Sequence, residues 1–87
     1  MFSVNDIKAL KWIKEHHGEV SFRNGYYTFN EDGTYKNDIS TKIVEYVVVE
    51  VGFEKKMALT IEAATLQLQE RYYGMSWNNE KRIELYA

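Results

Sequence analysis

The chain has 87 residues, 45% of them hydrophobic and 15% aromatic, which suits one small folded domain over residues 1–87 rather than a disordered segment. It contains no cysteine, so disulfides, thiolate nucleophiles and cysteine-based zinc sites are excluded. The formal charge is −2, and no apolar run approaches the roughly 20 residues of a membrane span, so we expect a cytoplasmic protein with no membrane association and little affinity for nucleic acid.

The first predicted element is a helix that begins after Ser3 and ends near Gly18. Ser3 and Asp6 have the spacing of a capping box, in which each side chain accepts a hydrogen bond from the backbone N–H of the other residue. Gly18 follows two histidines and is predicted to be the C′ residue, where a helix ends in the left-handed conformation. Apolar residues at helical spacing predict the buried stripe, which is Val4, Ile7, Leu10 and Ile13, with Ala9 as a further member.

A β-hairpin is predicted over residues 19–30. Two runs of β-forming residues flank Asn24-Gly25, a dipeptide preferred in type I′ turns, and this turn would pair Arg23 with Tyr26. A second turn with Gly33 in the left-handed conformation would extend the hairpin into a three-stranded meander, with Phe29 opposite Tyr35. The face predicted to enter the core carries Val20, Phe22, Tyr27 and Phe29.

The second half of the chain is predicted to be mainly helical. Residues 39–51 fit both structures, because their β-branched content favours a strand while the spacing of their apolar residues, ended by Gly52, favours a helix slightly more. A helix is predicted more firmly over residues 60–74, capped by Thr60 and ended by Gly74. Its predicted buried stripe is Ile61, Ala64, Thr65, Leu68 and Tyr72.

Taken together, these elements predict an α+β fold. Its order is an N-terminal helix, a three-stranded antiparallel meander, two further helices and a short C-terminal strand. The strand is placed over residues 82–87, where apolar and polar residues alternate.

Metal binding and catalysis find little support in the sequence. His16 and His17 are adjacent, so on a helix they point about 100° apart and cannot chelate one ion as a pair four residues apart does. A calcium loop over residues 28–39 fails at its first and twelfth ligand positions, which are Thr28 and Ile39. No P-loop, nucleophile elbow, metalloprotease or dinucleotide-binding motif occurs. We therefore expect that the protein is not an enzyme and that it binds neither a metal ion nor a cofactor.

A second stripe on the helix over residues 60–74 leads to the functional prediction. Leu66 and Tyr73 fall roughly 120–140° from the predicted core stripe, and Trp77 follows soon after. Aromatic residues are enriched at protein interfaces, so we expect a protein-binding module that acts sterically on another protein, as an inhibitor or adaptor. Small acidic chains of this profile are common among accessory proteins of mobile elements. The predicted partner-binding residues are Leu66, Tyr73, Trp77, Glu62 and Glu70.

Three alternatives to this function stay open. Arg23, Tyr26 and Lys36, on the outer face of the predicted hairpin, would combine stacking and charge as single-stranded nucleic-acid binders do. In a second alternative, the chain is a homo-oligomer in which the additional apolar stripe of one copy packs against that of another, with a homodimer as the simplest case. Under the remaining alternative, the helix lies between two other elements and both of its stripes are buried.

Overall fold

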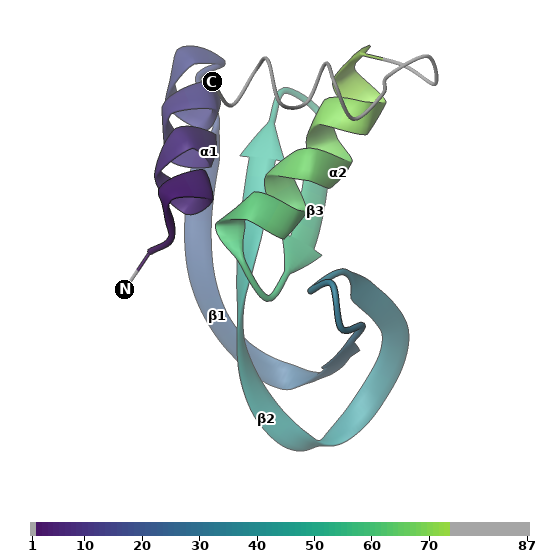
Figure 1. Cartoon of the computed structure of the whole chain (residues 1–87). Helices are drawn as coiled ribbons and strands as arrows, with labels where there is room; N and C mark the ends of the chain where they lie inside the picture. Colours follow the sequence, from purple (N-terminus) through teal and green to yellow (C-terminus); the bar gives the residue numbers. More distant parts are fainter. Residues whose placement is uncertain (1, 74–87) are drawn as a thin grey trace.

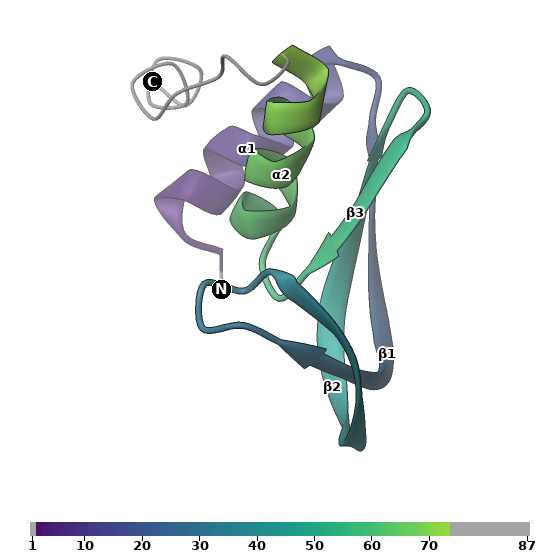
Figure 2. The ribbon, with the colours of Figure 1, turned by 90° about the vertical axis from the view of Figure 1, so that its right-hand side faces the viewer.

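The computed structural model describes residues 2–73, and for residues 71–73 the backbone alone. The elements are α1 (Val4–Glu15), β1 (Glu19–Phe29), β2 (Tyr35–Val51), β3 (Glu54–Ala58) and α2 (Ile61–Tyr73). The strands form one antiparallel sheet in the order β1-β2-β3, and both helices lie on the same face of it (Figure 1 and Figure 2). The α+β class and the three-stranded antiparallel sheet are thus confirmed, whereas the strand predicted over residues 82–87 lies outside the described residues.

α1 confirms the predicted capping box, and it confirms the predicted buried stripe at Ala9, Leu10 and Ile13 but not at Val4 and Ile7. The Ser3 hydroxyl accepts the N–H of Asp6 at 3.1 Å, and the Asp6 carboxylate accepts the N–H of Ser3 at 3.2 Å. The stripe is wrong at its first turns, because Val4 is 68% exposed and Ile7 is 58% exposed. The carboxylate of Asp6 also binds the start of α2, so the face that carries Asp6 turns inward. The buried residues of α1 are Asp6, Ala9, Trp12 and Ile13.

The end of α1 is a Schellman motif shifted by one residue from the prediction. His17, with φ of +57°, is the left-handed C′ residue, and Gly18 is C″. The N–H of Gly18 binds the carbonyl of Ile13 at 2.8 Å, which is the long hydrogen bond of this motif. Glycine is required at position 18 for a different reason. A Cβ atom there would lie 2.6 Å from the backbone carbonyl oxygen of Glu50, so no side chain fits.

β1 runs straight through Asn24-Gly25, so the predicted type I′ hairpin and its register are wrong. Phe22 lies opposite Val47, and Arg23 lies opposite Tyr46 rather than Tyr26. The long apolar segment of β2 offers a partner for the first seven residues of β1, and this extended pairing outweighs the local preference of the dipeptide for a turn. Register shifts follow Gly25, where the hairpin bends and carries its tip toward the helices (Figure 2).

The turn predicted at Gly33 is confirmed, and it is the turn that joins β1 to β2. Gly33 has φ of +88°, and Phe29 lies opposite Tyr35 as predicted. Asp32 accepts hydrogen bonds from the hydroxyl of Thr34 at 2.6 Å and from its N–H at 3.0 Å. These bonds stabilise the charged carboxylate, so they hold the pKa of Asp32 below its usual value of 3.8.

The hairpin tip returns to the connection between β3 and α2. The N–H of Leu59 donates to the carbonyl of Gly33 at 2.8 Å, and Thr34 forms a bridge with Ala58. Ala58 therefore has a backbone neighbour on each side, Val47 of β2 and Thr34 of the tip. The tip thus covers the end of β3 and holds the start of α2 (Figure 1).

Residues 35–51 form one strand, so the slight preference for a helix over residues 39–51 is wrong. Four of the five residues from Val47 to Val51 are valine, whose branched side chain favours a strand over a helix. The predicted helix end at Gly52 is a two-residue turn between β2 and β3. Gly52 is the first residue of this turn and has φ of +62°, as type II′ turns require.

Apolar clusters lie on both faces of the sheet. The cluster on the helix face includes Trp12, Ile13, Val47, Val49, Val51, Ile61 and Leu68, with Val20 packed at its edge. The opposite face carries an aromatic cluster whose ring centroids lie 5.3–5.9 Å apart, formed by Tyr27, Phe29, Tyr35 and Tyr46. The four residues predicted to share a core face are therefore divided. Val20 packs against the helix-side core, Tyr27 and Phe29 belong to the aromatic cluster, and Phe22 is 53% exposed.

α2 confirms its predicted cap and its described stripe. The Thr60 hydroxyl accepts the N–H of Ala63 at 3.1 Å. Gln69 is also fully buried, and neither atom of its amide has a hydrogen-bond partner among residues 2–70. Among the described helices, none has the length and apolar character needed to cross a membrane. The confirmed stripe residues are Ile61, Ala64, Thr65 and Leu68, and the side chain of Tyr72 lies outside the described part.

Candidate functional site

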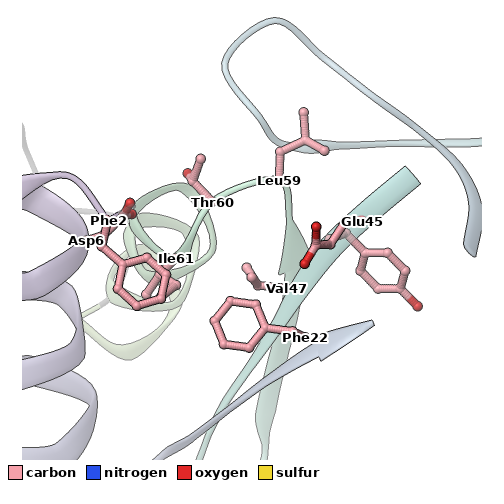
Figure 3. Close-up of a pocket in the computed structure, with 9 residues that line it drawn as sticks. Phe2, Asp6, Phe22, Glu45, Val47, Leu59, Thr60 and Ile61 are labelled. Atoms are coloured by element: carbon pink, nitrogen blue, oxygen red, sulfur yellow. The ribbon is translucent and has the colours of Figure 1, made fainter. Parts of the chain in front are cut away.

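A groove opens between the start of α1, the strands β1 and β2, and the connection from β3 to α2 (Figure 3). Its volume is about 230 Å³, and we call it the apolar groove. The buried side chains of Val47 and Ile61 form its floor. The remaining lining residues are Phe2, Phe22, Tyr46 and Leu59, with Asp6, Glu45 and Thr60 as the polar members.

Asp6 fixes the end of the groove by joining the starts of both helices. One carboxylate oxygen accepts the N–H of Glu62 in α2 at 2.9 Å, and the other accepts the N–H of Ser3 at 3.2 Å. The first N–H groups of a helix have no partner inside it and carry partial positive charge, so one carboxylate satisfies two helix starts. The side-chain amide of Asn5 adds a hydrogen bond of 2.9 Å to the carboxylate of Glu62. Asp6 therefore positions the groove, and both of its oxygens are already bonded.

Three large apolar side chains stand at the mouth of the groove. The rings of Phe2 and Phe22 are stacked, with 6.0 Å between centroids and 12° between planes. Phe22 lies opposite Val47 in the sheet and so points to the helix side, yet about half of its surface is exposed. Leu59 is exposed to a similar degree on the other side of the mouth (Figure 3). These side chains form an apolar rim that nothing in residues 2–70 covers.

Glu45 supplies the free charge of the groove. It lies two residues before Val47 in β2, so strand alternation places it on the same face. Glu45 is exposed and makes no ion pair within the described part of the chain. Because Asp6 is occupied by two N–H donors, Glu45 is the carboxylate of the groove with capacity to bind a cationic group.

The residues predicted to bind a protein partner are only partly placed by the structure. Glu62, Leu66 and Glu70 follow one another at intervals of four along α2 and therefore share one side of that helix. Leu66 is half-buried and Glu70 is exposed, while Glu62 is half-buried and bonded to α1. Tyr73 ends α2, but its side chain and the whole of Trp77 lie outside the described residues.

The residues of the nucleic-acid alternative are exposed but are not assembled as predicted. Arg23 pairs with Tyr46 across the sheet, so it is not the cross-strand neighbour of Tyr26. Tyr26 lies in the irregular segment after Gly25, and Lys36 lies at the start of β2. The hairpin face on which the three residues were expected to meet is therefore absent.

The two histidines diverge at the end of α1. The Nδ1 atom of His16 lies 2.8 Å from the carbonyl oxygen of Trp12, and its ring stacks on the indole with 4.3 Å between centroids. His17 leaves the helix in the left-handed conformation. Within residues 2–73, no group of three or more histidine, aspartate or glutamate side chains is placed to hold a metal ion.

Comparison with models of protein families, with curated proteins and with solved structures finds no match to this chain.

The groove residues were missed from the sequence, although a signal for two of them was present. Phe2 and Leu59 each stand immediately before a helix N-cap, which is Ser3 in α1 and Thr60 in α2. An apolar residue at this N′ position commonly packs beside the first turn of its helix. Because Asp6 brings the two helix starts together, the two N′ residues border the same groove.

Proposed function

We propose that this chain is a protein-binding module whose apolar groove receives a large apolar side chain of another protein. The observation that carries the proposal is the grouping of Phe2, Phe22 and Leu59, each about half exposed, around a cavity of about 230 Å³. Grouped apolar side chains with a concave centre are typical of surfaces that bind other proteins. The floor residues Val47 and Ile61 would desolvate the incoming side chain.

The charge of the groove determines which residue of the partner is favoured next to the inserted apolar side chain. Glu45 is the exposed acid on the groove, and the whole chain carries a formal charge of −2. A lysine or arginine beside the inserted side chain would meet Glu45, whereas an aspartate or glutamate there would be repelled. The favoured ligand is therefore a segment with a large apolar residue next to a basic residue.

The mode of action that follows is steric. The groove residues that are free to contact a ligand are apolar, apart from Glu45 and Thr60, which suits binding by packing and charge. Covering a basic and apolar segment of a partner blocks its other contacts, which is how a small inhibitor or adaptor acts. The mobile-element accessory class predicted from the sequence agrees with such a role.

The surface predicted on α2, with Leu66, Tyr73, Trp77, Glu62 and Glu70, stays a prediction as a second place of contact. Its described members Glu62, Leu66 and Glu70 lie on a different side of α2 from Ile61, which faces the groove. A Leu66→Ser variant separates the two surfaces, because it leaves every groove residue in place.

A peptide-display selection against the immobilised full-length chain tests the groove. The selected sequences should share a large apolar residue within one or two positions of lysine or arginine. The Leu59→Asp variant should bind a selected peptide at least about tenfold more weakly, since it places a charge on the apolar rim. Glu45→Lys should weaken binding less, and its effect should shrink as salt is added.

Phe53→Asp is the matched control for Leu59→Asp. Phe53 is a fully exposed apolar residue on the turn between β2 and β3, and it is not among the residues that line the groove. Peptide binding should be unchanged in this variant. Selected peptides rich in acidic residues, or equal losses in the Phe53 and Leu59 variants, would contradict the proposal.

A further inference from the structure

The outer edge of β1 has no neighbouring strand within residues 2–73. β1 is the first strand in the sheet order and pairs with β2 alone among the described strands. Its first seven residues keep a regular register with β2, and the register shifts only after Gly25. An edge of this length presents N–H and C=O groups that readily pair with another strand.

We propose that this edge pairs with the same edge of a second copy of the chain, antiparallel and centred on Ser21. A two-fold axis at Ser21 brings Glu19 opposite Arg23 of the partner subunit. The same axis brings Val20 opposite the partner's Phe22. The pairing is repeated on the other side of the axis, so the dimer has two contacts of each kind and a continuous six-stranded sheet.

Charge selects this register over its neighbours. Glu19 and Arg23 are both exposed, and neither makes an ion pair within the described residues. In its own sheet Glu19 lies opposite Glu50, which is already 3.6 Å from the ammonium of Lys55. An axis one residue later would place Arg23 opposite serine and Glu19 opposite glycine, so both charges would lose their partners.

The helix face of the edge has a place for the partner's Phe22. A shallow hollow beside the start of β1 is lined by the apolar side chains of Leu10, Ile13 and Val20, with Lys14 at its border. Phe22 is 53% exposed and points to the same face as Val20. In the Ser21-centred register the partner's Phe22 stands next to Val20, which is the strand residue of the hollow.

This proposal goes beyond the proposed function because it uses the strand edge and the Leu10 hollow rather than the groove. Phe22 borders both surfaces, so it is left unchanged in the test. The charged pair lies on the sheet face opposite the helices, since Arg23 pairs with Tyr46 of the aromatic cluster.

Sedimentation equilibrium of the full chain from about 1 µM to about 1 mM tests the dimer. The wild type should shift from monomer to dimer mass with rising concentration. Arg23→Glu places two like-charge pairs in the interface and should raise the dimer Kd roughly 10- to 100-fold. The double variant Glu19→Arg, Arg23→Glu exchanges the two charges and should bring the Kd back to within about threefold of the wild type.

Lys36→Glu is the matched control, because it makes the same charge change at an exposed residue away from this edge. Its dimer Kd should equal that of the wild type at high salt. Amide exchange gives a second readout, in which protection of residues 19–23 should rise with protein concentration while circular dichroism shows each variant folded. Leu59→Asp should leave the dimer intact, so failure of the groove and failure of the edge are distinguishable.

The proposal is overturned by monomer mass over the whole concentration range, or by loss of dimer in Arg23→Glu that the charge exchange does not restore. Concentration-independent protection of residues 19–23 would also overturn it, because another part of the same chain would then cover the edge.

Discussion

Replacing Asp6 with alanine should be among the most destabilising polar substitutions in the described part of the chain. Asp6 is 8% exposed, and its carboxylate accepts the N–H of Ser3 at 3.2 Å and the N–H of Glu62 at 2.9 Å. Alanine removes both carboxylate oxygens, and its methyl group cannot accept a hydrogen bond from either helix start. The loss therefore affects α1 and α2 together, although one residue is changed.

The expected magnitude follows from the two caps. Loss of a capping side chain costs about 0.5–2 kcal/mol, and a hydrogen bond to a charged group contributes about 1.5–3 kcal/mol. Two such bonds in a nearly buried position give an expected loss of about 2–4 kcal/mol in the free energy of unfolding. A domain of 87 residues has roughly 4–13 kcal/mol in total, so the substitution removes a large part of it. The corresponding fall in Tm is roughly 10–30 °C.

Urea unfolding followed by circular dichroism measures this change, with Ser3→Ala as the matched control. Ser3→Ala removes only the acceptor for the N–H of Asp6, so it should cost about 0.5–2 kcal/mol. Asp6→Asn should fall between the two, because its amide oxygen can still accept one N–H but its NH₂ group cannot accept the other. The m value should be the same in all variants, since the unfolded surface is unchanged.

The reasoning fails if Asp6→Ala costs no more than Ser3→Ala. That result would mean that the carboxylate caps α1 alone and that the bond to Glu62 contributes nothing. A full loss in Asp6→Asn would instead show that charge at the two helix starts matters more than the second acceptor.

Two further predictions concern the end of α1 and the hairpin tip. Gly18→Ala should lower the free energy of unfolding in urea by about 1–3 kcal/mol, because its Cβ has no room. His17→Gly should raise that free energy by up to about 1 kcal/mol, because glycine adopts a positive φ without strain. A stabilising Gly18→Ala together with a destabilising His17→Gly would contradict the assignment of His17 as the C′ residue. Thr34→Val should raise the pKa of Asp32 toward 3.8 in an NMR titration. A lowered pKa in the folded state gives stability that is present above the unfolded pKa and is lost as the pH falls through the folded pKa. The variant should therefore lose less stability than the wild type on acidification below about pH 4. An unchanged pKa of Asp32 in Thr34→Val would contradict the assigned cause.

Short-range signals in the sequence predicted structure well where one local interaction decides it. The caps at Ser3 and Thr60 and the turn at Gly33 each depend on residues within four positions of one another. Gly18 was identified as part of the helix end but at the wrong position. The left-handed residue is His17, and position 18 requires glycine because the close approach of β2 leaves no space for a side chain there.

The sequence predictions were wrong where a local turn or helix signal competes with pairing to a distant strand. Asn24-Gly25 favours a turn, but the valine-rich half of β2 pairs with the whole segment around it and keeps it extended. The same valines were assigned to a helix because a short apolar run fits both periods. Their β-branched character was the more informative property, and it agrees with the strand observed.

The candidate site could not be predicted as a unit, because its members come from four segments of the chain. Phe22 looked like a core residue, but its ring is half exposed and stacks on Phe2, which lies just before the start of α1. Phe2 and Leu59 were recognisable as N′ residues of two helices, but their meeting depends on the bond between Asp6 and α2. Contacts between residues so far apart in the chain cannot be predicted from composition or periodicity.

The return of the hairpin tip to α2 decides where the chain can be extended for practical use. Turn tips are normally the places that accept inserted residues. Here added residues at Asp32 and Gly33 would separate the tip from Leu59 and disturb the start of α2. The turn at Gly52-Phe53 has open space around it, with no atom within 4 Å of a Cβ built on the glycine, and is the better point for a fluorescent label or a fused domain.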